Sequence, residues 1–332
     1  MREMSPEQVR LARVASQRLT RRCADDGASA AQVLADVLGV QAQDRRAALA
    51  GVCLRRPGIT AEEVERARVE ERTIATTWLM RGTLHLVASE DLPWLLGMLG
   101  PTFAPRLQWR LRQLGISERD VDAAVAVIAE TLSDRGPLTR AEIAGELVSR
   151  ELLPDTAGQR PAHLIGAAAT RGLVCVGPMR GAKATYAFLP EWLGVMPSAL
   201  PVPEREAALV EFARRYLEAF GPAGPRDFAF WSGLPVREAR TAFESVRTGA
   251  EEVRVGGETL LAMPGSRALT CASTDPGGER VDLPSWDNYL MGYADRSFSL
   301  GPGIVDSIGP NGGVLLHARL VDGIVVGRWD AG

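Results

Sequence analysis

One order of elements recurs three times along this chain and narrows strongly the folds that it can adopt: helices followed by a β-hairpin. The middle repeat shows this order best. Residues 139–142 read Thr-Arg-Ala-Glu, the form of a capping box that begins a helix, and Pro161 marks the start of the next helix. Strands are then predicted at 173–176 and 185–189. Helices followed by a hairpin are the order of a winged helix.

The first repeat has the same order. A helix is predicted at 6–23, and another starts at Ser29, a good N-cap residue. A capping box at 60–63 begins a further helix. The hairpin is predicted from two β-rich segments, 73–80 and 83–87, on either side of an Arg-Gly turn.

A third repeat follows the proline-rich segment 197–203. Helices are predicted at 204–220 and 225–232, and Gly256-Gly257 forms the turn of the hairpin. Beyond this hairpin the pattern changes to strands and loops, in which Asp322-Gly323 indicates a type I′ turn.

We therefore predict a mainly α fold with β strands, built from three tandem winged-helix units and a C-terminal part rich in strands. The predicted boundaries are 1–115, 116–196 and 197–268 for the three units, and 269–332 for the C-terminal part. Tryptophans on apolar faces of the predicted helices are expected to pack in the core: Trp94, Trp109, Trp192 and Trp231.

The net charge and the motifs of the sequence exclude several classes of function. The net charge of −3 excludes a protein that coats nucleic acid through bulk positive charge, so any DNA contact requires a local basic surface. The glycine motifs of ATPases and dehydrogenases and the nucleophile elbow of serine hydrolases are absent. Dispersed cysteines and histidines, no signal peptide and no membrane-spanning run predict a cytoplasmic protein without a metal or other cofactor.

Three strings of residues point to a family. The first is Gln41-Ala42-Gln43-Asp44, the second is the hairpin sequence from Trp78 to Val87, and the third runs from Trp286 to Ser297. In this order they resemble the AlkZ/YcaQ-type winged-helix DNA glycosylases. The resemblance covers almost the whole chain, from about Leu11 to Trp329.

The resemblance implies three winged-helix units around a concave DNA-binding face, followed by a small C-terminal β-barrel-like part. It implies hydrolysis of the N-glycosidic bond of N7-alkylated guanine in duplex DNA, in some members including bulky or crosslinked adducts. Some members protect bacteria against DNA-alkylating natural products that the bacteria themselves make. The family's catalytic pair, a glutamine followed after one residue by glutamine or aspartate, falls here on Gln41 and Gln43.

Three features depart from the family pattern. Asn288 stands where an acidic residue is common, and Ala294 stands where a basic one is common. The chain ends at Gly332, where the family usually continues with more strand and a helix. We expect these differences to affect lesion contacts of the C-terminal part more than the glutamine pair.

Two amides suffice for this chemistry because alkylation at N7 makes guanine cationic, so that the base departs neutral without a general acid. A glutamine carbonyl can then orient the attacking water. The neighbouring Asp44 is an alternative base, since a carboxylate both orients water and accepts a proton. Without the resemblance, Gln41 and Gln43 would be interpreted as a polar turn that caps the next helix.

The first predicted wing carries candidate DNA contacts. Arg81, Thr83 and His85 are expected near the DNA backbone, although His85 is equally typical of a hydrogen-bonded core histidine. A further cluster of arginines extends the basic face or forms a solvated helix surface: Arg106, Arg110 and Arg112.

The C-terminal string offers candidates for the lesion pocket. Trp286, Asp287 and Tyr289 either line that pocket, or the aromatic side chains form core and Asp287 caps a turn. Lyase activity requires an amine, and Lys183, the only lysine, lies on a predicted wing tip, where a phosphate contact is the simpler role.

The sequence thus predicts a monomeric, monofunctional DNA glycosylase whose partner is duplex DNA that carries alkylated purines. Two alternatives stay open. One is a winged-helix DNA-binding regulator or lesion sensor without catalysis, and the other is a protein-interaction scaffold whose winged helices do not contact DNA.

Overall fold

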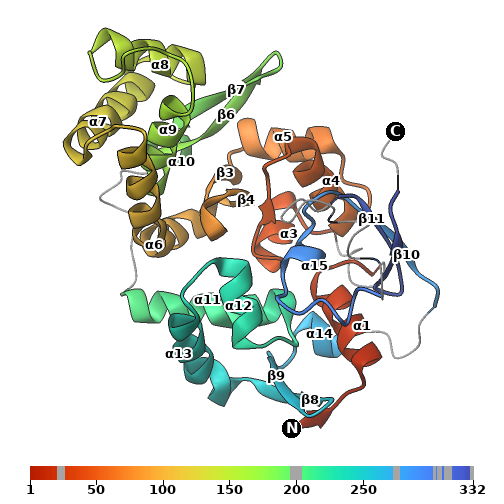
Figure 1. Ribbon diagram of the computed structural model, residues 1–332. Coiled ribbons are helices and arrows are strands. Elements are labelled where there is room, and N and C mark those ends of the chain that lie inside the picture. Colours follow the sequence, from red (N-terminus) through yellow and green to blue (C-terminus); the bar gives the residue numbers. More distant parts are fainter. Residues whose placement is uncertain are drawn as a thin grey trace. The chain divides into compact units, whose positions relative to one another are not determined.

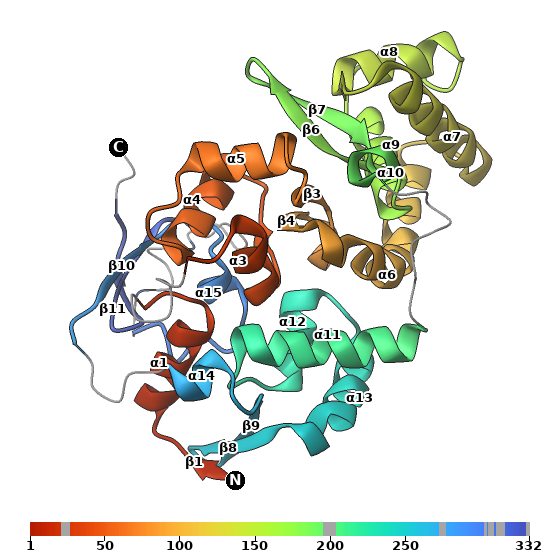
Figure 2. The same cartoon turned by 180° about the vertical axis from the view of Figure 1, so that it is seen from behind.

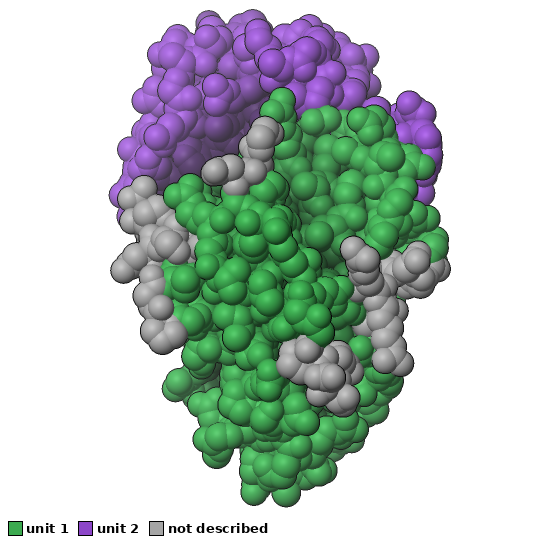
Figure 3. Space-filling view, turned by 90° about the vertical axis from the view of Figure 1, so that its right-hand side faces the viewer, with its two compact units in different colours: residues 1–65, 86–88, 204–332 green, residues 66–85, 89–203 purple. Residues whose placement is uncertain are grey.

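The computed structural model describes residues 1–20, 27–194, 204–271, 277–301, 304, 309 and 316–329. The segment 197–203 and residues 21–23 of the first predicted helix lie outside the described residues. The chain divides into two compact units, coloured separately in Figure 3. Unit 1 comprises 1–65, 86–88 and 204–332, and unit 2 comprises 66–85 and 89–203. The division into three winged-helix units and a C-terminal part stays a prediction.

Unit 1 is mainly helical and contains three-stranded sheets ordered β1-β8-β9 and β10-β11-β12 (Figure 1). Its helices are α1 (Pro6–Ser16), α3 (Ala30–Asp36), α4 (Arg45–Arg55), α11 (Arg205–Phe220), α12 (Pro225–Ser232), α13 (Val236–Val246), α14 (Arg267–Thr270) and α15 (Asn288–Met291), with a 3₁₀ turn at Arg247–Gly249. Its strands are β1 (Arg2–Glu3), β2 (Val40–Gln41), β8 (Glu251–Val255), β9 (Glu258–Ala262), β10 (Arg280–Leu283), β11 (Ala318–Val321) and β12 (Ile324–Gly327).

Unit 2 contains the long helix α6 and a second set of helices followed by a hairpin. Its helices are α6 (Leu92–Gln113), α7 (Glu118–Arg135), α8 (Arg140–Ser149), α9 (Arg160–Thr170) and α10 (Leu189–Leu193), with 3₁₀ turns at Met80–Gly82 and Ser89–Asp91. Its strands are β3 (Ile74–Trp78), β5 (Leu138–Thr139), β6 (Val174–Arg180) and β7 (Lys183–Phe188). Helix α5 (Ala61–Val69) and strand β4 (Leu84–Ala88) extend from one unit into the other.

Local signals explain most element boundaries. The predicted capping box at the start of α8 is present: the Thr139 hydroxyl accepts from the Glu142 amide, and the Glu142 carboxylate accepts from the Thr139 amide. Ser29 caps α3 in the same way, with Gln32 as its partner. Gly172 adopts a φ of +74° just after α9, as a glycine that follows a helix often does.

The β6–β7 hairpin lies against α9 and α10 in both views of the chain (Figures 1 and 2). Strand β5 pairs with the outer side of β7, which gives the antiparallel order β5-β7-β6. The core below this sheet consists mainly of aliphatic side chains from α7, α8 and α9, among them Ile128, Ile143 and Leu164. Both strands are longer than predicted and extend further toward the tip of the hairpin.

Helices α11, α12 and α13 enclose an aromatic core in unit 1, followed by the predicted β8–β9 hairpin. Tyr216 lies at its centre, with its ring centroid 4.8 Å from that of Phe220 and 5.2 Å from that of Trp231. Gly256 and Gly257 both have positive φ, as a type I′ turn requires.

Three expectations need correction. The first predicted helix ends at Ser16, because Arg18 adopts a φ of +56° that a right-handed helix cannot continue through. In the described residues, the C-terminal strands form the open antiparallel sheet β10-β11-β12 and no closed barrel. Trp109 is 55% exposed and therefore does not pack in the core.

Candidate active site

The Gln-Ala-Gln-Asp segment lies in unit 1, where the chain passes from β2 into α4. Gln41 ends the strand and is only 9% exposed, whereas Gln43 is exposed. The Asp44 carboxylate caps α4 by accepting from the amides of Arg46 (2.8 Å) and Ala47 (3.2 Å). The segment therefore presents one amide at the surface and another held in the protein, just before a capped helix.

The turn that precedes this segment is fixed from the C-terminal part of the chain. The buried Asn288 side chain donates to the carbonyl oxygens of Val37 (3.3 Å) and Gly39. Gly39 has a φ of +81°, and a Cβ there would lie 2.5 Å from Cγ1 of Val87. Only glycine fits this turn, so the path of the backbone into Gln41 is closely determined.

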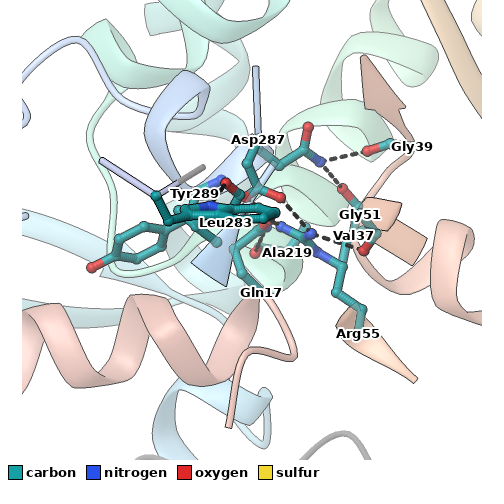
Figure 4. A network of polar contacts seen from close by, with 11 residues as sticks. Gln17, Val37, Gly39, Gly51, Arg55, Ala219, Leu283, Asp287 and Tyr289 are labelled. Atoms are coloured by element: carbon teal, nitrogen blue, oxygen red, sulfur yellow. Dashed lines mark hydrogen bonds and ion pairs between the residues drawn. The ribbon is translucent and has the colours of Figure 1, made fainter. Parts of the chain in front are cut away.

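A buried ion pair fixes the other end of α4. The two terminal guanidinium nitrogens of Arg55, Nη1 and Nη2, contact the Asp287 carboxylate at 2.7 and 2.8 Å, and neither side chain is more than 1% exposed. Arg55 also donates to the Gly51 carbonyl and to Gln17, whose own amide donates to the Ala219 carbonyl. Figure 4 shows this network, which joins α4 to the start of α15.

Trp286 and residues 289–291 of the third string lie in or beside the hydrophobic cluster of the C-terminal sheet. Tyr289 is buried, donates to the Gly323 carbonyl (2.8 Å) and accepts from Ser299. Burial raises the pKa of Tyr289 to about 12. Trp286 is half-buried against the same cluster. Asp287 also accepts from the Tyr289 amide and so caps α15.

The candidate wing residues lie in unit 2, apart in sequence from the glutamine segment. Arg81 and Thr83 line a cavity there, and Arg81 adopts a φ of +58° in the turn after β3. His85 is buried, and its Nδ1 lies 3.0 Å from the Thr83 carbonyl oxygen. Burial, with the charge of Arg81 adding to it, lowers the pKa of His85 to about 3. His85 is therefore neutral at physiological pH.

The tip of the β6–β7 hairpin carries the only lysine. Lys183 is exposed at the start of β7. Its neighbour Arg180 forms an ion pair with Glu142 at 2.7 Å and donates to the Pro137 carbonyl. The sequence places two cations at this tip, Arg180 and Lys183. Arg180 is ion-paired, whereas Lys183 is exposed and forms no ion pair with the described part of the chain.

Sequence reasoning overlooked Arg55 and Gln17 and treated Asn288 only as a departure from a family pattern. One signal was available: Arg55 follows Leu49 and Val52 on the apolar side of α4, where a buried charge needs a partner. Its partner is 232 residues away in sequence, and no spacing rule indicates it.

In the described residues, no group of three or more His, Cys, Asp or Glu side chains is arranged to hold a metal ion. No described helix is long and apolar enough to cross a membrane.

Fold and site together define a mainly helical protein with small sheets and a fixed glutamine segment. The family model for AlkZ-like DNA glycosylases matches residues 34–332. An interstrand DNA cross-link repair glycosylase of Streptomyces sahachiroi is 30% identical over 310 residues, which cover 91% of this chain and 82% of that protein.

The structure of the Streptomyces sahachiroi DNA glycosylase AlkZ superposes with a TM-score of 0.83 at 28% identity, over 100% of this chain and 89% of that chain. The chain belongs to the AlkZ-like DNA glycosylase family.

Proposed function

We propose that this protein is a monofunctional DNA glycosylase that hydrolyses the N-glycosidic bond of N7-alkylated guanine in duplex DNA. The observation that carries the proposal is the Gln41-Ala42-Gln43 segment, held by Asn288 and a capped helix in a chain of this family. Because the similar Streptomyces protein is named for interstrand cross-link repair, we extend the proposal to bulky and crosslinked adducts. Self-protection against a genotoxin is the corresponding biological role.

In the proposed reaction, water adds to C1′ of the sugar, and the C1′–N9 bond breaks with its electron pair moving to the base. The cationic purine thereby leaves as a neutral molecule, and the proton of the water passes to solvent. Gln43, which is exposed, orients the water through its side-chain carbonyl. Gln41 contributes the second amide of the catalytic pair. Asp44 supports both glutamines by capping α4.

The other candidates take supporting roles. Three tandem winged-helix units provide the DNA-binding surface, with the exposed Lys183 and the turn at Arg81 and Thr83 as phosphate contacts. The burial of His85 favours a structural role for it. Asp287 and Tyr289 are likewise buried, which favours core and capping roles, so Trp286 is the candidate of its string for a lesion contact. We propose a monomer that acts in the cytoplasm.

The proposal is tested with duplex DNA that carries a single N7-methylguanine. We expect release of free 7-methylguanine and strands that break on heating, while duplexes with uracil or undamaged purines stay intact. Salt-sensitive binding without base release would instead indicate a regulator or lesion sensor. Absence of DNA binding would indicate an interaction scaffold.

The product should be an intact abasic site, because the chain has almost no amine to form a Schiff base with the sugar. Apart from the N-terminus, Lys183 is the only candidate, and it lies on the β6–β7 hairpin of unit 2. We expect borohydride to trap no protein–DNA adduct on a denaturing gel. A trapped band that disappears in Lys183→Ala would contradict this expectation.

Asn288 should act as a positioning residue for the glutamine segment. Asn288→Ala leaves the carbonyls of Val37 and Gly39 without their donor. Because small displacements at a reacting centre are costly, we expect the rate of base release at saturating enzyme to fall about 10- to 100-fold. Duplex affinity, measured by fluorescence anisotropy, should change less than threefold in the same variant.

Ser29→Ala is the matched control for Asn288→Ala. It removes the cap at the opposite end of α3, and helix caps are worth about 0.5–2 kcal/mol, similar to a buried hydrogen bond. A general loss of stability would slow both variants alike, whereas positioning predicts a slow Asn288→Ala and a nearly normal Ser29→Ala.

A further inference from the structure

Unit 2 contains a groove of about 450 Å³ between the turn after β3, helix α6 and helix α9. This volume suits one small ligand or one to two residues of an extended polymer. About half of its lining consists of aromatic and cationic side chains: Trp78, Phe103, Trp109, Arg81, Arg106 and Arg110.

The groove is positively charged in a protein that is negative overall. Among the residues that the structure describes, no Asp or Glu lines it, although the chain carries a net charge of −3. The guanidinium of Arg110 donates to the neutral amides of Gln113 (3.2 Å) and Gln159 (2.7 Å), which orient it without cancelling its charge. Burial and the charge of Arg110 lower the pKa of His163, another lining residue, as expected for a site of positive potential.

A cavity of unit 1 has a formally neutral lining instead. It is lined by three arginines together with Asp227, Glu258 and Asp295. Acidic groups in such numbers repel a phosphate, whereas the charged side chains among the described residues that line the unit 2 groove are arginines. Charge complementarity therefore assigns a polyanion to the groove of unit 2.

The exposed aromatic side chains indicate which class of polyanion the groove of unit 2 binds. Trp109 leaves 55% of its surface in solvent, although an apolar ring of this size is usually well buried. The rings of Trp78 and Phe103 line the same groove. Aromatic rings between arginines are the pattern that binds unpaired nucleotides, because bases stack on the rings while arginines contact phosphates. In an intact duplex the base faces are already stacked and unavailable to a protein ring.

We propose that this groove binds a single-stranded segment of DNA, with a base stacked on Trp109 and phosphates contacted by Arg106 and Arg110. The choice of DNA rests on the proposed function. A glycosylase meets unpaired nucleotides when a damaged base leaves the stack or when an adduct distorts pairing. The groove lies in a different unit from the glutamine segment, and Arg81 and Thr83, the phosphate contacts proposed above, belong to its lining.

The test is anisotropy of a fluorescein-labelled 12-residue oligothymidylate titrated with the full chain. Thymidylate contains no purine, so binding is measured without any base release. Stacking contributes about 1–3 kcal/mol per base, and we therefore expect Trp109→Ala to weaken binding about 5-fold or more. Trp109→Phe keeps a ring at this position and should retain most of the affinity.

Arg110→Ala should weaken binding and lower the slope of log K against log salt by about 0.7, the value for one neutralised phosphate on a single strand. Arg119→Ala is the matched control, because Arg119 is an exposed arginine of the same unit that does not line the groove. It should bind oligothymidylate like the wild type.

The proposal is overturned if the wild type does not bind oligothymidylate, or if Trp109→Ala binds as tightly as the wild type. It is also overturned if Arg119→Ala weakens binding as much as Arg110→Ala, since general charge then explains the affinity. Equal loss of binding to a 12-base-pair duplex in Trp109→Ala would assign the groove to duplex DNA instead. Gln43→Ala should keep oligothymidylate binding. If the wild type binds oligothymidylate but releases no base from N7-methylguanine duplexes, only the proposed glycosylase activity is refuted.

Discussion

Alanine at Gln43 should reduce the rate of 7-methylguanine release about 100- to 1,000-fold, the usual cost of removing one preorganised polar group at a reacting centre. Gln43 is exposed, so its loss leaves no buried group without a partner. Melting temperature and duplex affinity should therefore match those of the wild type. The rate is measured in single turnover with enzyme in excess, so that product release does not limit it.

Gln41→Ala should also slow base release, but with a measurable loss of stability, because this side chain is only 9% exposed. The family pattern allows aspartate at the second position of the pair, so Gln43→Asp should retain activity. Gln8→Ala, which removes an exposed glutamine from the capping box of α1 in the same unit, is the control and should release base normally.

In the competing explanation, Asp44 and not the glutamine pair orients the attacking water and accepts its proton. Asn is as good a helix cap as Asp, so Asp44→Asn removes the negative charge while keeping α4 capped. If both glutamine variants keep rates within threefold of the wild type and Asp44→Asn does not, the amide mechanism is wrong and Asp44 is the base.

Elements whose signals are local in sequence were predictable. Helix α12 has the predicted bounds, and the Asp322-Gly323 turn has positive φ at both residues, as a type I′ hairpin requires. Signals that depend on distant packing misled the prediction. The apolar pattern around Trp109 indicated burial, but Arg106 and Arg110 of the same helix share the open groove with it.

The site was predictable only in its first part. The resemblance identified Gln41 and Gln43, because their string is local in sequence. The residues that hold this string were not predictable, since Asn288 lies 249 residues from Gly39 and Asp287 lies 232 residues from Arg55. The sequence allows two interpretations of Asp287, and one of them, a cap, is correct because Asp287 caps α15. The ion pair of Asp287 with Arg55 is not visible in the periodicity of either segment.

The second large expected effect is a loss of stability when the ion pair of Arg55 and Asp287 is broken. Asp287→Ala leaves the Arg55 guanidinium buried, with 0% side-chain exposure and no carboxylate partner. Losing one member of a buried pair typically costs about 3–5 kcal/mol, because the remaining charge is neither solvated nor neutralised. We expect a loss of this size in the free energy of unfolding, measured by urea denaturation. The exposed pair of Arg205 and Glu238 is the control, and Glu238→Ala should cost less than about 1 kcal/mol.

A double variant separates the buried charge from the lost contacts. In Arg55→Met with Asp287→Ala no charge stays buried, and methionine fills much of the space of the arginine stem, so the double variant should be more stable than Asp287→Ala alone. The Gly51 carbonyl and Gln17 still lose their donor, so stability should not return to that of the wild type. If Asp287→Ala costs no more than Glu238→Ala, or if the double variant is the less stable one, then the pair does not hold α4 against α15. The positioning of the glutamine segment would then rest on Asn288 alone.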